Sequence, residues 1–422
     1  MKPRFFLTLT LVFAIFLGSC ALFRPADPAG YETTVPGTQP VQDTGDNSSD
    51  TSVFRDTETD TETAAPEIQE TVVSFVGAGD NIVYYGNVRD AASCALPGGR
   101  SYNFAPIYKD VAERIATADI SFINQETLMC GEGYKFSYYP MFNGPQDMGY
   151  DLAELGFDVV NIANNHMLDK GAAGLKATID FWNTFEEVTL IGGYLNEEDY
   201  NTVRVVEASG IRVAFLSYAF YANGLTLPAS SELIFPYPDE ETVARQIKKA
   251  QEEADFVIVS AHWGDENTFT PNDEQRQWAE YFAECGADAV IGHHPHVIQP
   301  IEWITRPDGK KMLCVYSLGN FVAEMARDYN MLGGLISFDI IRRGNEVTAE
   351  NVVFTPTVYY FTTSFYRNHV YLLTDFTKKM ALSHGLAYYG RSLSIDTLMK
   401  YLHNTIDDSF LPAGLRRADH AE

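Results

Sequence analysis

The sequence of 422 residues predicts an α/β fold for most of the chain. From residue 71 onward, apolar runs of strand length alternate with amphipathic segments of helical periodicity, which is typical of α/β proteins. Polar clusters rich in histidine, asparagine and carboxylates follow the predicted strands at their carboxyl ends. Hydrophobic residues make up 45% and charged residues 21% of the chain, and these near-average values exclude disorder along its whole length.

The individual elements are expected from apolar runs bounded by turn and capping residues. Strands are expected at 72–78, 120–123, 159–163, 190–192, 213–218, 256–261, 289–291 and 313–316. Helices are expected at 106–116, 145–155, 172–182, 241–253 and 273–285, where proline, glycine or acidic residues suit the helix ends. Residues 338–362 predict further β structure with a hairpin turn at 343–345, and residues 375–403 predict helical structure.

The amino terminus has the pattern of an export signal. Lys2 and Arg4 precede an apolar run over residues 5–17, and small residues then lead to Cys20. The run is shorter than the roughly 20 residues that a membrane-spanning helix needs. Residues 1–19 resemble a bacterial lipoprotein signal peptide, which implies lipidation of Cys20 and an extracytoplasmic protein anchored to the cell membrane. The alternatives are an ordinary cleaved signal and an uncleaved anchor.

The rest of the chain divides by composition. Residues 20–70 predict a disordered, acidic, threonine-rich tether because they contain almost no large apolar residues. Residues 71–370 are expected to form the folded domain, and residues 371–422 a C-terminal helical region. The formal charge of −27 becomes −29 if residues 1–19 are removed with their two basic residues, which argues against a nucleic-acid partner. The five cysteines predict no thiolate metal site, and pairing of Cys94 with Cys130 stays open.

The polar clusters predict a metal site. Ligands in open α/β sheets bind at the carboxyl ends of the strands, where these clusters meet. Three of the nine histidines fall within the four residues His293-His294-Pro295-His296. Imidazoles combined with carboxylates favour one or two divalent ions, with Mn, Zn or Fe preferred. Taken singly, each acid could instead cap a turn, and each histidine could be a hydrogen-bonded core residue.

The order of the motifs resembles one protein family. The chain is similar to the CapA family of capsule and poly-γ-glutamate synthesis proteins, a branch of the calcineurin-like metallophosphoesterases, over residues 72–322. The resemblance implies a four-layer sandwich in which two mixed β-sheets are flanked by helices, with a two-metal centre. The motifs that carry it are GAGDN, INQET, IANNHMLDKG, SAHWGDE, GADAVIGHHPHVIQPIEW and YSLGNFV.

The resemblance also implies a role for each site residue. His166 would be the catalytic histidine. The implied metal ligands are Asp80 and His296 for the first ion, Glu126 as the bridging carboxylate, and Asn165, His262 and His294 for the second ion.

Three positions depart from the superfamily's usual pattern. Glu126 replaces the usual bridging aspartate. Ile82 replaces a histidine ligand of the first ion, and Met167 replaces an aspartate, so Asp169 would have to orient His166 instead. Trp263 and Asn320 are expected to line the cleft, as is Tyr316, with core packing as the alternative for the two aromatic residues.

By this resemblance, the chain would be a membrane-tethered, metal-dependent hydrolase or transferase in the synthesis, export or processing of capsule or poly-γ-glutamate. Its expected partners are the anionic surface polymer or its precursor, the membrane, and membrane synthase subunits. Two alternatives remain. The first is a non-catalytic polymer-binding subunit of a membrane synthesis complex, and the second is a general metallophosphoesterase.

Overall fold

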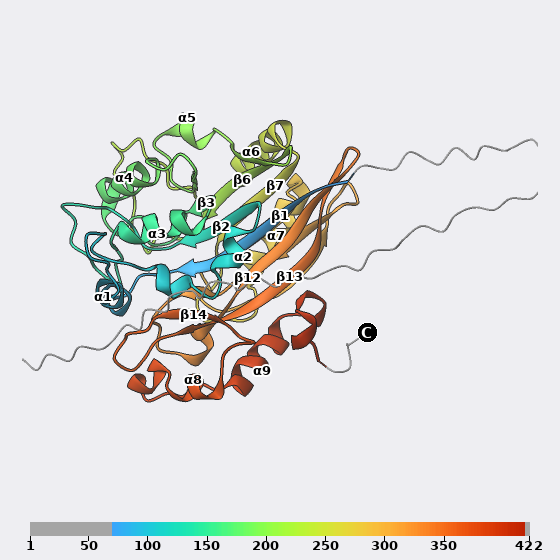
Figure 1. Cartoon of the computed structure of the whole chain (residues 1–422). Helices are drawn as coiled ribbons and strands as arrows, with labels where there is room; N and C mark the ends of the chain where they lie inside the picture. The colour runs from blue at the N-terminus through green and yellow to red at the C-terminus, as the bar shows by residue number, and fades with distance from the viewer. Residues whose placement is uncertain (1–69, 418–422) are drawn as a thin grey trace, which may run out of the picture. The chain divides into compact units, whose positions relative to one another are not determined.

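The computed structural model describes residues 70–417, which belong to one compact unit. Two mixed β-sheets pack face to face, and helices cover their outer faces, which confirms the predicted four-layer α/β sandwich (Figure 1). The predicted signal, Cys20 and the tether up to residue 69 lie outside the described residues. No helix among residues 70–417 is long and apolar enough to cross a membrane.

The first sheet contains eight of the strands in the described part of the chain. Strands β1 to β4 run parallel, and β12 to β14 extend the sheet antiparallel on the other side of β1. The short strand β11 pairs with the last residues of β1. In spatial order the strands are β14 (His369–Leu372), β13 (Glu346–Tyr360), β12 (Leu332–Arg343), β1 (Glu70–Asn81), β2 (Ile120–Gln125), β3 (Val159–Asn161) and β4 (Thr189–Ile191), with β11 (Asn320–Val322) beside β1.

The second sheet contains six strands within residues 70–417. Its four central strands run parallel, and an antiparallel strand closes each edge. Their order is β5 (Arg204–Ala208), β6 (Ile211–Ala219), β7 (Phe256–His262), β8 (Ala289–His293), β10 (Lys311–Val315) and β9 (Ile301–Thr305). All eight individually predicted strands are therefore present, and the hairpin turn expected at 343–345 joins β12 to β13.

Apolar packing joins the layers. Between the sheets, Phe338 of β12 packs against Phe75 of β1 at 4.6 Å and Phe256 of β7 at 6.3 Å between ring centroids. On the outer face of the second sheet, helices α6 and α7 bury Val243 and Phe282 in a separate apolar cluster. The helices are α1 (Tyr85–Ser93), α2 (Ala112–Ala116), α3 (Asp147–Leu155), α4 (Gly171–Trp182), α5 (Glu197–Tyr200), α6 (Glu240–Glu253), α7 (Asp273–Cys285), α8 (Lys378–Leu382) and α9 (Ile395–Thr405).

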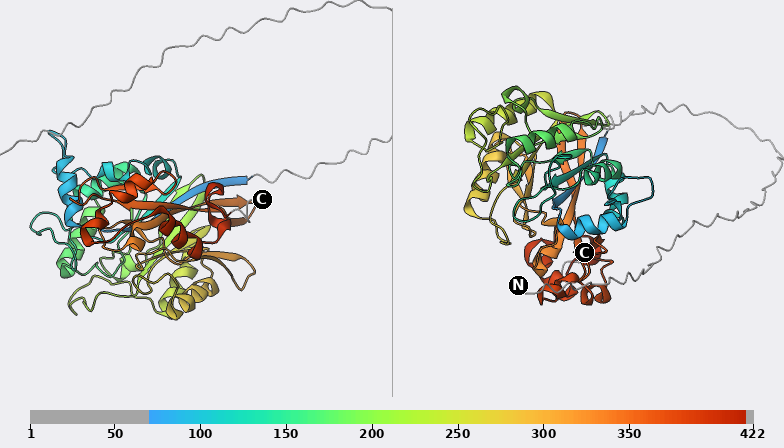
Figure 2. Two further views of the ribbon diagram at one scale, coloured as in Figure 1. Left: turned by 90° about the horizontal axis from the view of Figure 1, so that it is seen from below. Right: turned by 90° about the vertical axis from the view of Figure 1, so that its left-hand side faces the viewer.

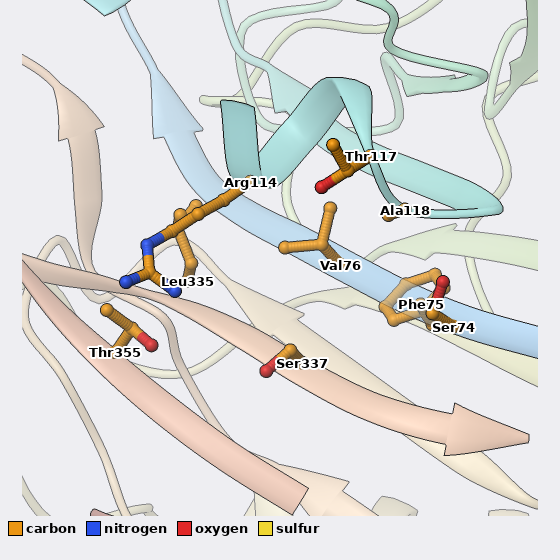
Figure 3. A pocket seen from close by; sticks show the side chains of 9 residues that line it. All are labelled: Ser74, Phe75, Val76, Arg114, Thr117, Ala118, Leu335, Ser337 and Thr355. Atoms are coloured by element: carbon orange, nitrogen blue, oxygen red, sulfur yellow. The ribbon is translucent and has the colours of Figure 1, made fainter. Parts of the chain in front are cut away.

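Two predicted helices are divided in the structure. The helix expected at 106–116 is a 3₁₀ turn over Ala105–Tyr108 followed by the short helix α2. A cavity of about 210 Å³ lies between α2 and strands β1, β12 and β13, beside Arg114 (Figure 3). The segment expected to be helical at 375–403 consists of α8, a 3₁₀ turn and α9. Gly385 lies between the two helices, where the backbone passes close to Phe361. A Cβ atom on Gly385 would lie 2.1 Å from the Phe361 ring.

The C-terminal segment, red in Figure 2, lies beside the orange strands of the first sheet. Its anchor is His384, which is 1% exposed. The His384 Nε2 atom faces the Tyr359 carbonyl of β13 at 3.0 Å, and Nδ1 accepts a hydrogen bond from the Leu386 N–H at 3.1 Å. Both ring nitrogens are therefore used by a neutral imidazole. Burial lowers the pKa of His384 from 6.5 to about 4.

We predict that His384 makes folding sensitive to mild acid. Its folded pKa is depressed, so its contribution is complete above pH 6.5 and is lost as the pH falls through about 4. Between pH 8 and pH 5 the wild-type chain should lose about 2 kcal/mol more unfolding free energy than a His384→Gln variant. Urea unfolding of both proteins at the two pH values measures the difference. Equal losses in the two proteins would contradict the prediction.

Candidate metal centre

The predicted site residues meet where the carboxyl ends of the two sheets come together. Asp80 lies near the end of β1, Glu126 directly follows β2, and His262 is the last residue of β7. Asn165 and His166 follow β3, and His294 and His296 follow β8. These side chains are all buried, with exposed fractions from 0% for Asp80, Glu126 and His262 to 7% for His166 and His294. The structure therefore brings the predicted set into one cluster.

A close approach of two strands positions Asp80. The Asp80 N–H donates to the Gly319 carbonyl at 3.0 Å. Gly79 permits this contact, because a Cβ atom there would lie 2.0 Å from the same carbonyl oxygen. The Asn124 side chain donates to Asp80 Oδ1 at 2.8 Å and fixes the orientation of the carboxylate. Asp80 is thus a buried side chain with a set direction toward the histidines of the other sheet.

Asp80, Glu126 and His296 form a first group that could hold a divalent ion. One ligand atom from each lies within 4.8 Å of the other two. His296 Nδ1 lies 3.1 Å from both Asp80 Oδ2 and Asn320 Oδ1. Its other nitrogen, Nε2, faces Glu126 Oε1 at 3.8 Å. Asn320 therefore orients His296 from within the protein.

Glu126, His262 and His294 form a second such group, again with ligand atoms within 4.8 Å of one another. The His262 Nε2 atom lies 3.8 Å from Glu126 Oε1 and 2.9 Å from Asn165 Oδ1, so the Asn165 amide oxygen points into this group. Glu126 is shared by the two groups. Both of its oxygens are buried without a hydrogen-bond partner in the described part of the chain, and a bound cation would satisfy them.

The protonation of the cluster is arranged around one ion pair. Burial and the charge of Asp80 raise the pKa of Glu126 well above its usual range. Burial also acts to raise the pKa of Asp80, but the neighbouring His293 and the hydrogen bond with His296 hold it well below its usual range. The pKa of His296 is raised to about 9 despite burial, through Glu126 and Asp80. His296 therefore carries a proton at neutral pH that a bound metal would have to displace.

The loop after β8 is held in a strained conformation. His294 has φ = 98° and His296 has φ = 55°, in the left-handed region that costs non-glycine residues about 1–3 kcal/mol each. Hydrogen bonds hold the backbone in place: the Asn330 side chain donates to the His296 carbonyl at 3.0 Å, and the Trp263 N–H donates to the His293 carbonyl at 3.1 Å. These hydrogen bonds hold the loop in the strained conformation from which both imidazoles reach the carboxylates.

His166 lies beside the cluster and is oriented by Asp169, as its sequence position suggested. The His166 Nδ1 atom lies 2.8 Å from Asp169 Oδ2, and the Phe142 ring packs edge-on against the imidazole at 4.7 Å. The carboxylate accepts the Nδ1 proton, which leaves Nε2 as the nitrogen available for proton transfer. His166 and Asp169 both line a pocket of about 330 Å³.

The structure corrects the expected cleft. Trp263 is 0% exposed, and its indole N–H donates to the Tyr316 carbonyl at 2.9 Å within the core behind the second sheet. Tyr316 packs against it, so the packing alternative holds for both aromatic residues. Asn320 is 1% exposed and serves His296 from behind the cluster. Ile82, buried beside Phe142 and offering no ligand atom, belongs to a small apolar cluster.

Three neighbours of the cluster were not predicted. Glu266 could join His294 and His296 in a third group of ligand atoms. Asn223 accepts a hydrogen bond from the Asn165 amide at 3.2 Å, which directs the Asn165 oxygen toward His262. His293 Nδ1 lies 3.6 Å from Asp80 Oδ1. Glu266 lies in the motif SAHWGDE and His293 in the motif GADAVIGHHPHVIQPIEW. Asn223 lies in a loop whose sequence gives no sign of a role in the site.

Comparison with known proteins supports the resemblance. The family model described as "Bacterial capsule synthesis protein PGA_cap" matches residues 51–325. The PGA biosynthesis protein CapA of Bacillus subtilis (strain 168) is 31% identical over 195 residues, which cover 46% of this chain and 50% of that protein. The capsule biosynthesis protein CapA of Bacillus anthracis is 34% identical over 204 residues, covering 46% and 47%. The chain thus spans about half the length of these curated relatives.

Similarity to solved structures is weaker. The calcineurin-like phosphoesterase YfkN from Bacillus subtilis matches with a TM-score of 0.38 and 11% identity, covering 80% of this chain and 98% of that one.

We predict that Glu126→Gln removes metal-induced stabilisation while leaving the metal-free chain folded. A neutral amide replaces a carboxyl group whose pKa burial raises, and an uncharged amide oxygen binds a dication more weakly than a carboxylate does. Mn²⁺ at a hundred times its dissociation constant should stabilise the wild-type chain by about 2.7 kcal/mol. Thermal unfolding of the full-length chain with and without Mn²⁺ measures this, with the exposed Glu186→Gln as the control. An equal Mn²⁺ response in Glu126→Gln would exclude Glu126 as a ligand.

Proposed function

The chain belongs to the bacterial capsule synthesis protein family PGA_cap, and on that premise we propose that it is a metal-dependent hydrolase or transferase of an anionic surface polymer. In this proposal the polymer is capsule material or poly-γ-glutamate, or a precursor of either. The chain acts outside the cytoplasm and is tethered to the membrane through Cys20. Membrane synthase subunits are its proposed protein partners.

One observation carries the proposal: two groups of metal-ligating side chains share Glu126, and a histidine held by a carboxylate lies beside them. We assign Asp80, Glu126 and His296 to a first ion. Glu126 and His262 would hold a second ion together with Asn165 and His294. Two divalent ions in such positions supply stabilisation for both the attacking and the leaving oxygen of a displacement.

The protein's own residues then have separate tasks. His166 holds a proton at the edge of the centre, where a leaving group would need one, and Asp169 keeps its Nδ1 occupied. Asn223 keeps the Asn165 amide in the orientation that presents oxygen to the centre. Hydrogen bonds from Asn330 and Trp263 to the backbone of the loop that carries His294 and His296 hold this loop in place.

The lining of the site supports dependence on metal. Two pockets flank the centre, of about 330 Å³ beside His166 and about 400 Å³ beside His294, and both include Asn223 and Glu266. Among the described residues, neither pocket is lined by a lysine or an arginine. A polyanion would therefore meet acidic and neutral side chains, and bound cations would supply the attraction.

The location rests on the amino terminus. The charged residues, short apolar run and Cys20 favour lipoprotein processing, and the acidic residues of 20–70 would extend the tether by mutual repulsion. A multi-chain lipid anchor holds a protein at a membrane where a single acyl chain is marginal.

A second candidate function is a non-catalytic subunit that binds or guides the polymer. Ile82 favours it, because the first ion would have one ligand fewer than the superfamily pattern provides. A cation-containing groove could then bind polymer without cleaving it.

We predict that His166→Ala abolishes processing but keeps the metal, whereas His294→Ala loses both. Loss of a general acid costs about 10²–10⁴ in rate. The full-length wild-type chain, both variants and His403→Gln, from the C-terminal helix α9, are incubated with poly-γ-glutamate and Mn²⁺. Polymer length is followed by gel filtration, and bound metal by elemental mass spectrometry.

The outcomes separate the candidate functions. The proposal is supported if only the wild type and His403→Gln shorten the polymer. Unchanged shortening by His294→Ala protein that has lost its metal contradicts it. Metal-dependent polymer binding without shortening favours the accessory subunit, and turnover of simple phosphodiesters alone favours a general phosphoesterase.

A further inference from the structure

We propose that Glu266 is a further metal-binding residue, which acts with His294 and His296 on the solvent side of the centre. One ligand atom from each of these three residues lies within 4.8 Å of the other two. Glu266 follows β7 by four residues and comes from a different loop than the two histidines. The inference rests on the proposed metal centre and adds a ligand that the family resemblance did not imply.

The backbone holds this loop against the histidine loop. The Asn267 N–H, one residue after Glu266, donates to the Pro295 carbonyl at 2.7 Å, between the two histidines. The Asn330 amide donates both to Asn267 Oδ1 at 2.9 Å and to the His296 carbonyl at 3.0 Å. Asn330 is 0% exposed, so the connection lies inside the protein. Glu266 is therefore placed beside His294 and His296 by contacts that do not involve its own carboxylate.

The neighbouring polar groups point to a cation. His294 is 7% exposed, and its Nδ1 atom is buried without a hydrogen-bond partner in the described part of the chain. Within residues 70–417, the Glu266 carboxylate has no hydrogen bond or ion pair, whereas the adjacent Asp265 accepts a hydrogen bond from the Asn272 amide at 3.0 Å. An unpaired carboxylate close to an imidazole that has an unpaired nitrogen is a set of donors suited to a transition metal.

The proposal explains how the centre could tolerate Ile82. Without a histidine at that position, the first ion has three protein ligands in Asp80, Glu126 and His296, which leaves at least one coordination position for a further ligand. Glu266 supplies another carboxylate close to His296. Glu126 is fully buried, but Glu266 is exposed and lines both pockets, so Glu266 can be reached from the groove. A bound substrate would meet this ligand first.

The test measures metal binding alone. The full-length chain is stripped of metal and titrated with Mn²⁺, and the free ion is followed by its electron paramagnetic resonance signal. Glu266→Gln should weaken the binding of at least one ion tenfold or more, or reduce the number bound. Asp265→Asn is the matched control, because it removes the same charge one residue away and lines the same pocket. It should bind Mn²⁺ as the wild type does.

Each outcome has one meaning. Wild-type binding in Glu266→Gln overturns the role of Glu266 but leaves the proposed function intact. Equal weakening in Asp265→Asn overturns it as well, because the effect would then be one of general charge. A wild-type chain that binds no Mn²⁺ overturns both the inference and the metal centre. Thermal unfolding without metal checks that the variant is folded. If Glu266→Gln unfolds at a lower temperature than the wild type, Glu266→Ala is used in its place, and the Mn²⁺ titration of the variant that matches the wild type decides the question.

Discussion

Two carboxylates buried side by side, Asp80 and Glu126, impose the constraint on which the rest of the site depends. Neither is exposed to solvent, and like charges in such surroundings cannot both be ionised without a compensating cation. The metal-free protein meets this condition by pairing Asp80 with His296 and keeping the pKa of Glu126 high. His262 and His296 face these acids, and Asn124 orients Asp80.

Much of the fold serves to hold that arrangement. A relay of side chains crosses the sandwich: the Ser217 hydroxyl donates to Asn161, whose amide donates to Asn124 at 2.8 Å, and Asn124 donates to Asp80. Ser217 belongs to the second sheet and the other three to the first. The direction of one carboxylate is therefore determined by both sheets. Each buried amide donates a hydrogen bond to the next side chain of the relay. Replacing any one of these residues would therefore leave a neighbouring buried polar group without its partner and would destabilise the fold.

The sequence predicted the parts of this molecule that depend on local pattern. Buried strands such as β7 are continuous apolar runs, and the ligating residues stand at their ends, so both could be recognised. The short strands β5, β9, β11 and β14 were missed; β5, β9 and β14 are mostly half-buried and lack the continuous apolar run that marked β3 and β4. Trp263 was expected in the cleft but lies in the core, because successive side chains of an extended segment can point to opposite sides and the residue after a histidine ligand need not face the site. Asn223 acts only through tertiary contact, which no single-sequence pattern reports.

The ligand set also connects the two sheets. Asp80 and Glu126 come from the first sheet, and His262, His294 and His296 come from the second. An ion bound by Asp80 and His296 would close a loop of 216 residues, much as a disulfide does. Closing such a loop costs a flexible chain about 5 kcal/mol of entropy, and a cross-link removes that cost from folding. The loaded protein would therefore resist separation of its two sheets.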